Sequence, residues 1–254
     1  MIEKRKGFCI PPDNTTIWRY MSFTKFVDLI ATKKLYFHRL DQNEDSWEGF
    51  LPENYDIKDK LYIRYNRYIN CWSINNYESA AMWKVYGPPG ESVAIKTNVG
   101  KLKESLKGFG IPIHMGKVKY EKENIPHLDF YLPVLYKIKP YYDEHELRLC
   151  LSSAETPNPQ DFTPLIEALK TFGCDMKSED ILKNCSDDEH SKKANPKGIC
   201  ARVDLNSLID KVIMCPDKKS YLKDSLIHTL KHVMENNKID LIINDSGLRK
   251  RNSN

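Results

Sequence analysis

Two glutamates in residues 141–151, "YYDEHELRLCL", have the type and spacing that best fit catalytic chemistry. Glu144 and Glu146 are followed by an apolar alternation that predicts a strand. Residues two apart on a strand project to the same face, so both carboxylates would point one way and His145 the other. Two neighbouring carboxylates raise each other's pKa and suit chemistry at a sugar-like carbon. The alternative is a solvated strand end where Arg148 forms a same-face ion pair, and the spacing alone favours it.

The other polar motifs do not predict a metal site or a phosphate loop. His228 and His232 lie four apart on a predicted helix, but no HExxH pattern and no third ligand accompany them. A set with irregular spacing lies in a polar segment and is not expected to bind zinc: Cys174, Cys185 and His190. The run "GPPGES" lacks the Lys-Ser/Thr ending of a P-loop. Cys71 has no sequence-local partner, which predicts a buried, unreactive thiol.

The elements that must position these residues are short strands and helices without a strict βαβ rhythm. Predicted strands cover 15–22, 34–40, 68–73, 92–97, 113–121, 145–151, 199–205, 210–216 and 239–245. Predicted helices cover 22–34, with Ser22 as the N-cap, and 77–87, 99–108, 162–172 and 220–237. This mixture predicts an α+β fold.

Composition predicts a globular protein in one domain over residues 1–254, because 41% hydrophobic and 29% charged residues are mixed throughout. Residues 152–198 are expected to form a polar, partly mobile insertion, and residues 246–254 a basic tail. No apolar window could span a membrane, the N-terminus has no secretory h-region, and the seven cysteines lack a CxxC pair. A cytoplasmic location is expected, and the net charge of +4 permits a nucleic-acid partner.

An ordered series of motifs spans residues 17–150: "WRYMSFTKFVDLIATKKLYF", "EDSWEGF", "NCWS", "AAMWKVYG" and "YYDEHELRL". This series resembles a bacterial family known as domain of unknown function family 2971, with weaker similarity through residues 200–245. Three residues depart from the family pattern: Glu44, Ser46 and Leu147. The departures are local and leave Arg19, Ser73 and Glu146 in place.

A second resemblance concerns activity. Arg19 on the first long strand, Ser73 on a middle strand and Glu146 on a later strand are similar to the Arg-Ser-Glu signature of ADP-ribosyltransferases. That resemblance implies a split mixed β-sheet core with flanking helices, and NAD as the substrate. It also implies a toxin or phage-defence effector that modifies RNA, DNA or protein, with an antitoxin as a partner. Two alternatives stay open: a non-catalytic module that binds nucleic acid or protein, and an NAD glycohydrolase.

The resemblance also implies a role for each residue. Glu146 would stabilise the oxocarbenium-like centre left by nicotinamide, and Glu144 would position the acceptor nucleophile. Arg19 would bind the NAD phosphate or ribose through its bidentate fork, and Ser73 would brace Glu146 or the ribose. Three aromatic residues are candidates for stacking on nicotinamide: Trp18, Tyr20 and Trp72.

Overall fold

The computed structural model describes residues 2–43, 63–121, 131–152, 197–216 and 223–248. Its strands are β1 (Ile2–Glu3), β2 (Thr16–Ser22), β3 (Lys34–Arg39), β4 (Arg67–Ile74), β5 (Ser92–Asn98), β6 (Ile113–Lys117), β7 (Glu146–Ser152), β8 (Gly198–Arg202), β9 (Lys211–Met214) and β10 (Ile243–Asp245). Its helices are α1 (Phe23–Thr32), α3 (Ala80–Tyr86), α4 (Val99–Ser105), α8 (Leu205–Leu208) and α9 (Lys223–Asn236), with 3₁₀ turns η1 (Leu40–Gln42), η2 (Leu132–Leu135) and η3 (Lys139–Glu144). Within these ranges, no helix is both long and apolar enough to cross a bilayer.

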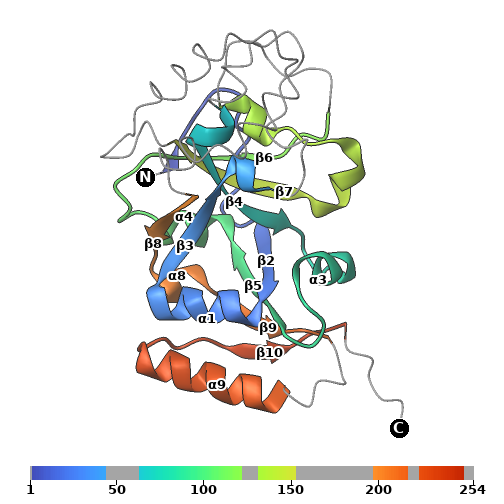
Figure 1. Ribbon diagram of the computed structural model, residues 1–254, viewed down its shortest axis with the longest axis vertical. Helices are drawn as coiled ribbons and strands as arrows, with labels where there is room; N and C mark the ends of the chain where they lie inside the picture. Colours follow the sequence, from blue (N-terminus) through green and yellow to red (C-terminus); the bar gives the residue numbers. More distant parts are fainter. Residues whose placement is uncertain (1, 44–62, 122–130, 153–196, 217–222, 249–254) are drawn as a thin grey trace, which may run out of the picture.

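The strands form one mixed sheet that branches at β4. The main path runs β1-β6-β7-β4-β2-β5-β9-β10, while β3 pairs with β4 and β8. The end pairs β1–β6 and β9–β10 are parallel, and the pairs between the other strands are antiparallel. One half of β4 therefore continues into β2 and the other half into β3, so the sheet divides into two wings (Figure 1).

The branch leaves a gap in the backbone pairing, which we call the sheet fork. β2 pairs with β4 only through Ile17–Ile74 and Trp18–Ser73, whereas β2 pairs with β5 along its whole length from Thr16 to Ser22. Beyond Trp18, β2 and β4 form no further register pair. The sheet fork therefore begins at Arg19, directly after the last pair.

Local sequence explains why α1 begins where β2 ends. The Ser22 side chain accepts a hydrogen bond from the Lys25 backbone N–H, which satisfies one of the free donors of the first turn. Phe26, Leu29 and Ile30 then recur at helical spacing, and all three are buried. The helix ends at Lys33, which adopts a left-handed conformation and returns its N–H to the Leu29 carbonyl.

The main core lies between one face of the sheet and the helices α1, α4, α8 and α9. It contains Ile17 and Met21 of β2, Phe26 of α1 and Leu230 of α9; α1 contacts α9, and both helices lie in the lower part of Figure 1, where β10 is drawn between them. A second cluster packs η2 against the other face around Ile69 and Cys150. A third packs α3 against β2 and β5. Both faces of the central strands are therefore covered.

The predicted α+β class and the split mixed sheet with flanking helices are confirmed. Several predicted bounds differ from the structure: β6 ends at Lys117 instead of residue 121, β7 begins at Glu146 instead of residue 145, and β10 covers only residues 243–245. Almost all of the predicted insertion at 152–198 lies outside the described residues, as do residues 249–254 of the predicted tail.

Candidate functional site

The two glutamates converge on one lysine, although they do not share a strand. Glu144 is the last residue of η3, His145 takes a left-handed conformation with φ 43°, and Glu146 is the first residue of β7. The prediction that both glutamates lie on one strand face is therefore wrong, because the chain turns at His145 before the strand begins. The carboxylates nevertheless come together, since Lys137 Nζ lies 2.7 Å from Glu144 Oε2 and 3.7 Å from Glu146 Oε2.

Glu146 forms a buried, two-point ion pair with Arg148 on the same strand. Arg148 Nε donates to Oε1 at 2.8 Å and Nη2 donates to Oε2 at 3.0 Å. Arg148 Nη1 also donates to the Val134 carbonyl in η2 at 2.7 Å, which fixes the plane of the guanidinium. Arg148 is fully buried and Glu146 is 6% exposed. Such bidentate, charge-assisted bonds hold a carboxylate in one orientation.

Glu144 is held by different partners. Its carboxylate accepts from Lys137 Nζ at 2.7 Å, and the Tyr86 hydroxyl at the end of α3 lies near enough to lower its pKa slightly. Its backbone carbonyl accepts a 2.8 Å hydrogen bond from Ser73 Oγ, and Ser73 faces Glu146 across the β4–β7 ladder. Ser73 thus lies between the two glutamates, and its hydroxyl bonds the Glu144 main chain instead of the Glu146 carboxylate, which was one of the two roles that the resemblance implied; the other, a contact with the ribose, stays a prediction. We call Lys137, Glu144, Glu146 and Arg148 the carboxylate cluster.

The environments of the two carboxylates move their pKa values in opposite directions. Burial by itself would raise the pKa of Glu146, but the charge and hydrogen bonds of Arg148, and then the charge of Lys137, hold it below the ordinary glutamate value. Burial raises the pKa of Glu144, and the bond and charge of Lys137 only partly oppose that effect. A pair of acids with separated pKa values is the usual sign of divided roles. Glu146 is suited to stay ionised, and Glu144 to accept a proton.

Arg19 is the most unusual side chain of β2. It stands between Ile17 and Met21, whose side chains enter the main core, so strand alternation puts a guanidinium on an apolar face. Its Nη1 is buried and has no hydrogen-bond partner among the described residues. Its guanidinium carbon lies 5.7 Å from the centroid of the Trp72 ring. Burial lowers the pKa of Arg19 to about 10, against a smaller opposing effect of Cys71, so the group remains a cation at neutral pH.

The three aromatic residues predicted to stack on nicotinamide are all buried. Trp18 is 3% exposed and donates from Nε1 to the Asn75 carbonyl, and the Tyr20 hydroxyl accepts from the Ser79 N–H. Both rings pack beneath α3 in the third hydrophobic cluster. Trp72 lies on the other face of the sheet beside Arg19 and is 2% exposed. Stacking on a ligand would need a movement of α3 or of the sheet fork, and it stays a prediction.

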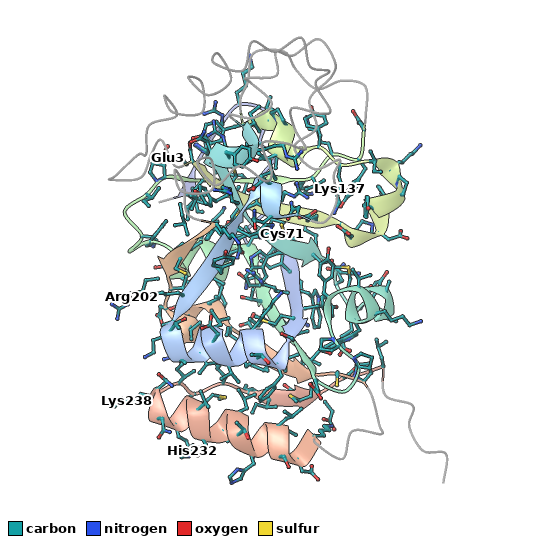
Figure 2. All side chains as sticks on the ribbon, viewed as in Figure 1. Glu3, Cys71, Lys137, Arg202, His232 and Lys238 are labelled. Atoms are coloured by element: carbon teal, nitrogen blue, oxygen red, sulfur yellow. The ribbon has the colours of Figure 1, made fainter. Side chains whose placement is uncertain are left out.

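Four residues at the site were not singled out by the sequence as site residues. Lys137 bridges the carboxylates, and the Tyr120 hydroxyl accepts a 2.8 Å bond from the Glu146 backbone N–H. The Tyr86 hydroxyl lies near Glu144 and the half-buried thiol of Cys71 lies near Glu146, and each lowers the pKa of the carboxyl beside it. Figure 2 places Cys71 and Lys137 in the same upper region of the molecule. Sequence spacing gave no signal for these residues, since each reaches the glutamates from a separate element.

The histidine pair is remote from this site. His228 and His232 are exposed on α9, where His232 Nε2 lies 3.1 Å from Asn236 Nδ2, and Figure 2 shows His232 at the opposite end of the molecule from Lys137. Within the described ranges, no group of three or more His, Cys, Asp or Glu residues could hold a metal ion. Cys174, Cys185 and His190 lie outside those ranges.

Comparison with solved structures gives a distant similarity. The fold is similar to a solved structure of DarT from Thermus sp. 2.9 in complex with carba-NAD+, at 9% sequence identity and a TM-score of 0.37, over 93% of this chain and 97% of that chain. No family model and no curated protein matches. The resemblance to family 2971 therefore rests on the motifs of the sequence alone. At this identity and TM-score, the structural similarity does not bear on the activity of the chain.

Proposed function

We propose that the protein is an NAD-dependent ADP-ribosyltransferase. The observation that carries the proposal is the carboxylate cluster, in which two glutamates share one lysine while their pKa values are moved apart. A solvated strand end, the alternative reading of this sequence, would leave both carboxylates exposed. Here Glu146 is 6% exposed, and the Glu144 side chain is 13% exposed.

The proposed reaction breaks the bond between nicotinamide and the ribose anomeric carbon of NAD. The bond's electron pair goes to the pyridinium ring, so neutral nicotinamide leaves and positive charge develops on the ribose. Glu146 would stabilise that charge and accept a hydrogen bond from a ribose hydroxyl. Arg148 donates one hydrogen bond to each oxygen of the Glu146 carboxylate. Because a carboxylate can accept about four hydrogen bonds, Glu146 can still accept one from the ribose.

The second half of the reaction forms the new glycosidic bond. A hydroxyl or amine of the acceptor attacks the anomeric carbon, and its proton passes to Glu144. A carboxylate with a raised pKa is a stronger base than an ordinary one, which suits this role. Lys137 stays protonated throughout and neutralises part of the charge of the pair. If water takes the place of the acceptor, the same steps give hydrolysis of NAD.

Arg19 supports NAD as the substrate. A guanidinium N–H that is buried without a partner costs free energy, and a protein keeps such a group where a ligand supplies the missing acceptor. The NAD diphosphate is an anion with several acceptor oxygens, which is the chemistry that arginine recognises best. Cys71 lies between the two parts of the site, because it influences the pKa of both Glu146 and Arg19.

The acceptor class that we propose is nucleic acid, because the chain carries a net charge of +4. The charge is modest, so protein acceptors belong in the same test. A toxin or phage-defence role and a neutralising antitoxin remain predictions of the sequence resemblance.

The test uses purified protein with NAD labelled on its phosphates, together with single-stranded DNA, RNA or a protein mixture. We expect label transfer to an acceptor or loss of NAD, and a fall of about 100-fold or more in Glu146→Gln. Glu104→Gln is the matched control, since Glu104 is exposed and paired only locally with Lys107 among its described contacts. The control should keep full activity.

The results separate the alternatives. Free ADP-ribose without labelled acceptor identifies a glycohydrolase. Salt-dependent nucleic-acid binding that survives Glu146→Gln, without NAD binding or turnover, identifies a binding module and refutes the enzyme. Unchanged turnover in Glu146→Gln would also refute the assigned chemistry.

A further inference from the structure

Lys137 is a buried lysine that no part of the sequence resemblance assigns. It follows Tyr136 in the segment between η2 and η3 and is 7% exposed. Its backbone N–H donates to the Lys119 carbonyl at 2.9 Å, and its Nζ lies 4.4 Å from the centroid of the Tyr141 ring. Lysine is rarely buried unless a charge compensates it. The buried ammonium of Lys137 must therefore be compensated by a negative charge nearby.

The distances indicate which carboxylate Lys137 serves. Its Nζ lies within hydrogen-bond distance of Glu144 at 2.7 Å but is 3.7 Å from Glu146, which Arg148 already binds at two points. Glu146 therefore keeps its charge and orientation without Lys137. Glu144 has no bond to an arginine in the described residues, and the charge of Glu146 favours a proton on it.

We propose that Lys137 is a positioning residue that keeps the Glu144 carboxylate ionised beside Glu146 and oriented toward the acceptor. The inference rests on the proposed function. It names the cation that allows two adjacent carboxylates to be ionised at the same time. The groups that face this pair come from several elements: Tyr86 of α3, Cys71 of β4, Arg148 of β7, Tyr120 after β6 and Tyr141 of η3. Among these groups and Lys137 itself, only Lys137 brings a cation to Glu144.

The perturbation is Lys137→Met, which keeps the length of the side chain and removes its charge. Loss of a nearby opposite charge raises a carboxyl pKa by about 1–3 units. Because Glu144 acts as a base, the acid limb of the pH profile of kcat/KM for NAD consumption should move to higher pH by a similar amount. The KM for NAD should change less than kcat, since Lys137 is assigned no contact with NAD.

Two further variants complete the design. Lys137→Arg keeps the charge and should keep the acid limb near its wild-type position, so it remains informative if Lys137→Met fails to fold. Lys119→Met is the matched control, because Lys119 is a half-buried lysine whose Nζ is 5.3 Å from the Tyr136 ring centroid and 3.4 Å from its hydroxyl. Its described contacts include no carboxylate, so its removal should leave the acid limb unchanged.

A direct titration makes the inference independent of turnover. The side-chain carboxyl of Glu144 can be followed by carbon-13 NMR in protein labelled at glutamate, with its signal assigned by its loss in Glu144→Gln. We expect an upward shift of this titration in Lys137→Met and no shift in Lys119→Met. An equal titration midpoint in wild type and Lys137→Met, or an equal shift in the control, would overturn the inference. Absence of NAD turnover in wild type would refute the proposed function alone.

Discussion

Replacement of Arg148 by methionine tests the buried ion pair at the centre of the site. Methionine keeps much of the volume of the side chain but removes the guanidinium that binds both oxygens of Glu146 and the carbonyl of Val134. The Glu146 carboxylate then stays 94% buried or takes a proton, with Lys137 Nζ 3.7 Å away as its remaining cation. We expect a large loss of stability, because the partner charge is left in the interior.

The magnitude follows from measurements on similar pairs. Removal of one partner of a buried ion pair costs about 3–5 kcal/mol, of which the orphaned charge and carbonyl account for most. Replacement of both partners by apolar residues is often neutral or stabilising. The double variant Glu146→Leu/Arg148→Met should therefore regain most of the stability lost by the single variant, although it should be inactive.

The assay is equilibrium unfolding in guanidinium chloride, with the fluorescence of buried tryptophans as the probe. A lower midpoint at an unchanged slope would report a true loss of stability. A single variant that loses less than about 1 kcal/mol, or a double variant as unstable as the single one, would refute the reasoning, because either result means that burial of the carboxylate costs little.

The pH dependence gives a second check with a definite sign. In wild type the pKa of Glu146 is lower in the folded state than in the unfolded state. Ionised Glu146 therefore adds to the free energy of unfolding above its unfolded pKa of about 4.3, and this stabilisation is lost as the pH falls through its folded pKa. Without Arg148, burial raises the folded pKa above the unfolded one, and stability is lost as the pH rises through that range. The deficit of Arg148→Met should therefore be smaller at pH 4 than at pH 7.

Three further predictions use other parts of the fold. Arg19→Met should abolish NAD binding in calorimetry while leaving the free energy of unfolding unchanged or higher, because it removes a buried donor that has no partner among the described residues; a large loss of stability would show that Arg19 serves the fold. Ser22→Ala should cost about 1 kcal/mol in denaturant unfolding, since α1 loses its N-cap bond, whereas a fully exposed Ser→Ala change elsewhere should cost almost nothing. Gly116→Ala should cost about 1–3 kcal/mol, since the added Cβ would lie 2.7 Å from Leu135 Cδ1 and 3.0 Å from Phe8 Cδ1; wild-type stability would mean that η2 yields freely.

Local sequence was sufficient for most of the elements. The cap at Ser22, the helical spacing of Phe26, Leu29 and Ile30, and the alternation after Glu146 are short-range signals, and each produced the expected element. The first residue of β7 was predicted one position too early. The left-handed turn at His145 ends η3 without a glycine, so the sequence carried no signal for it.

The strand order and the branch at β4 were decided by tertiary contacts. The order β7-β4-β2 brings together residues more than 100 positions apart in the chain, such as Trp18 and Glu146 on either side of Ser73. Alternation of side chains predicts that a segment is a strand and which face is buried. It does not predict which other strand pairs with it, because that depends on the packing of whole faces. The sequence resemblance supplied the expectation of a split sheet, and the fold supplied the register.

The type and spacing of Glu144 and Glu146 made them candidates for chemistry, and the family resemblance added Arg19 and Ser73; their roles stay predictions. Only the tertiary structure decided how they are held: Lys137 reaches both carboxylates from a separate segment, Arg148 binds one of them at two points, and the buried Nη1 of Arg19 has no partner among the described residues. The reason is physical. The charge state of a carboxylate depends on burial and on the nearest cation, and both are properties of neighbours in space.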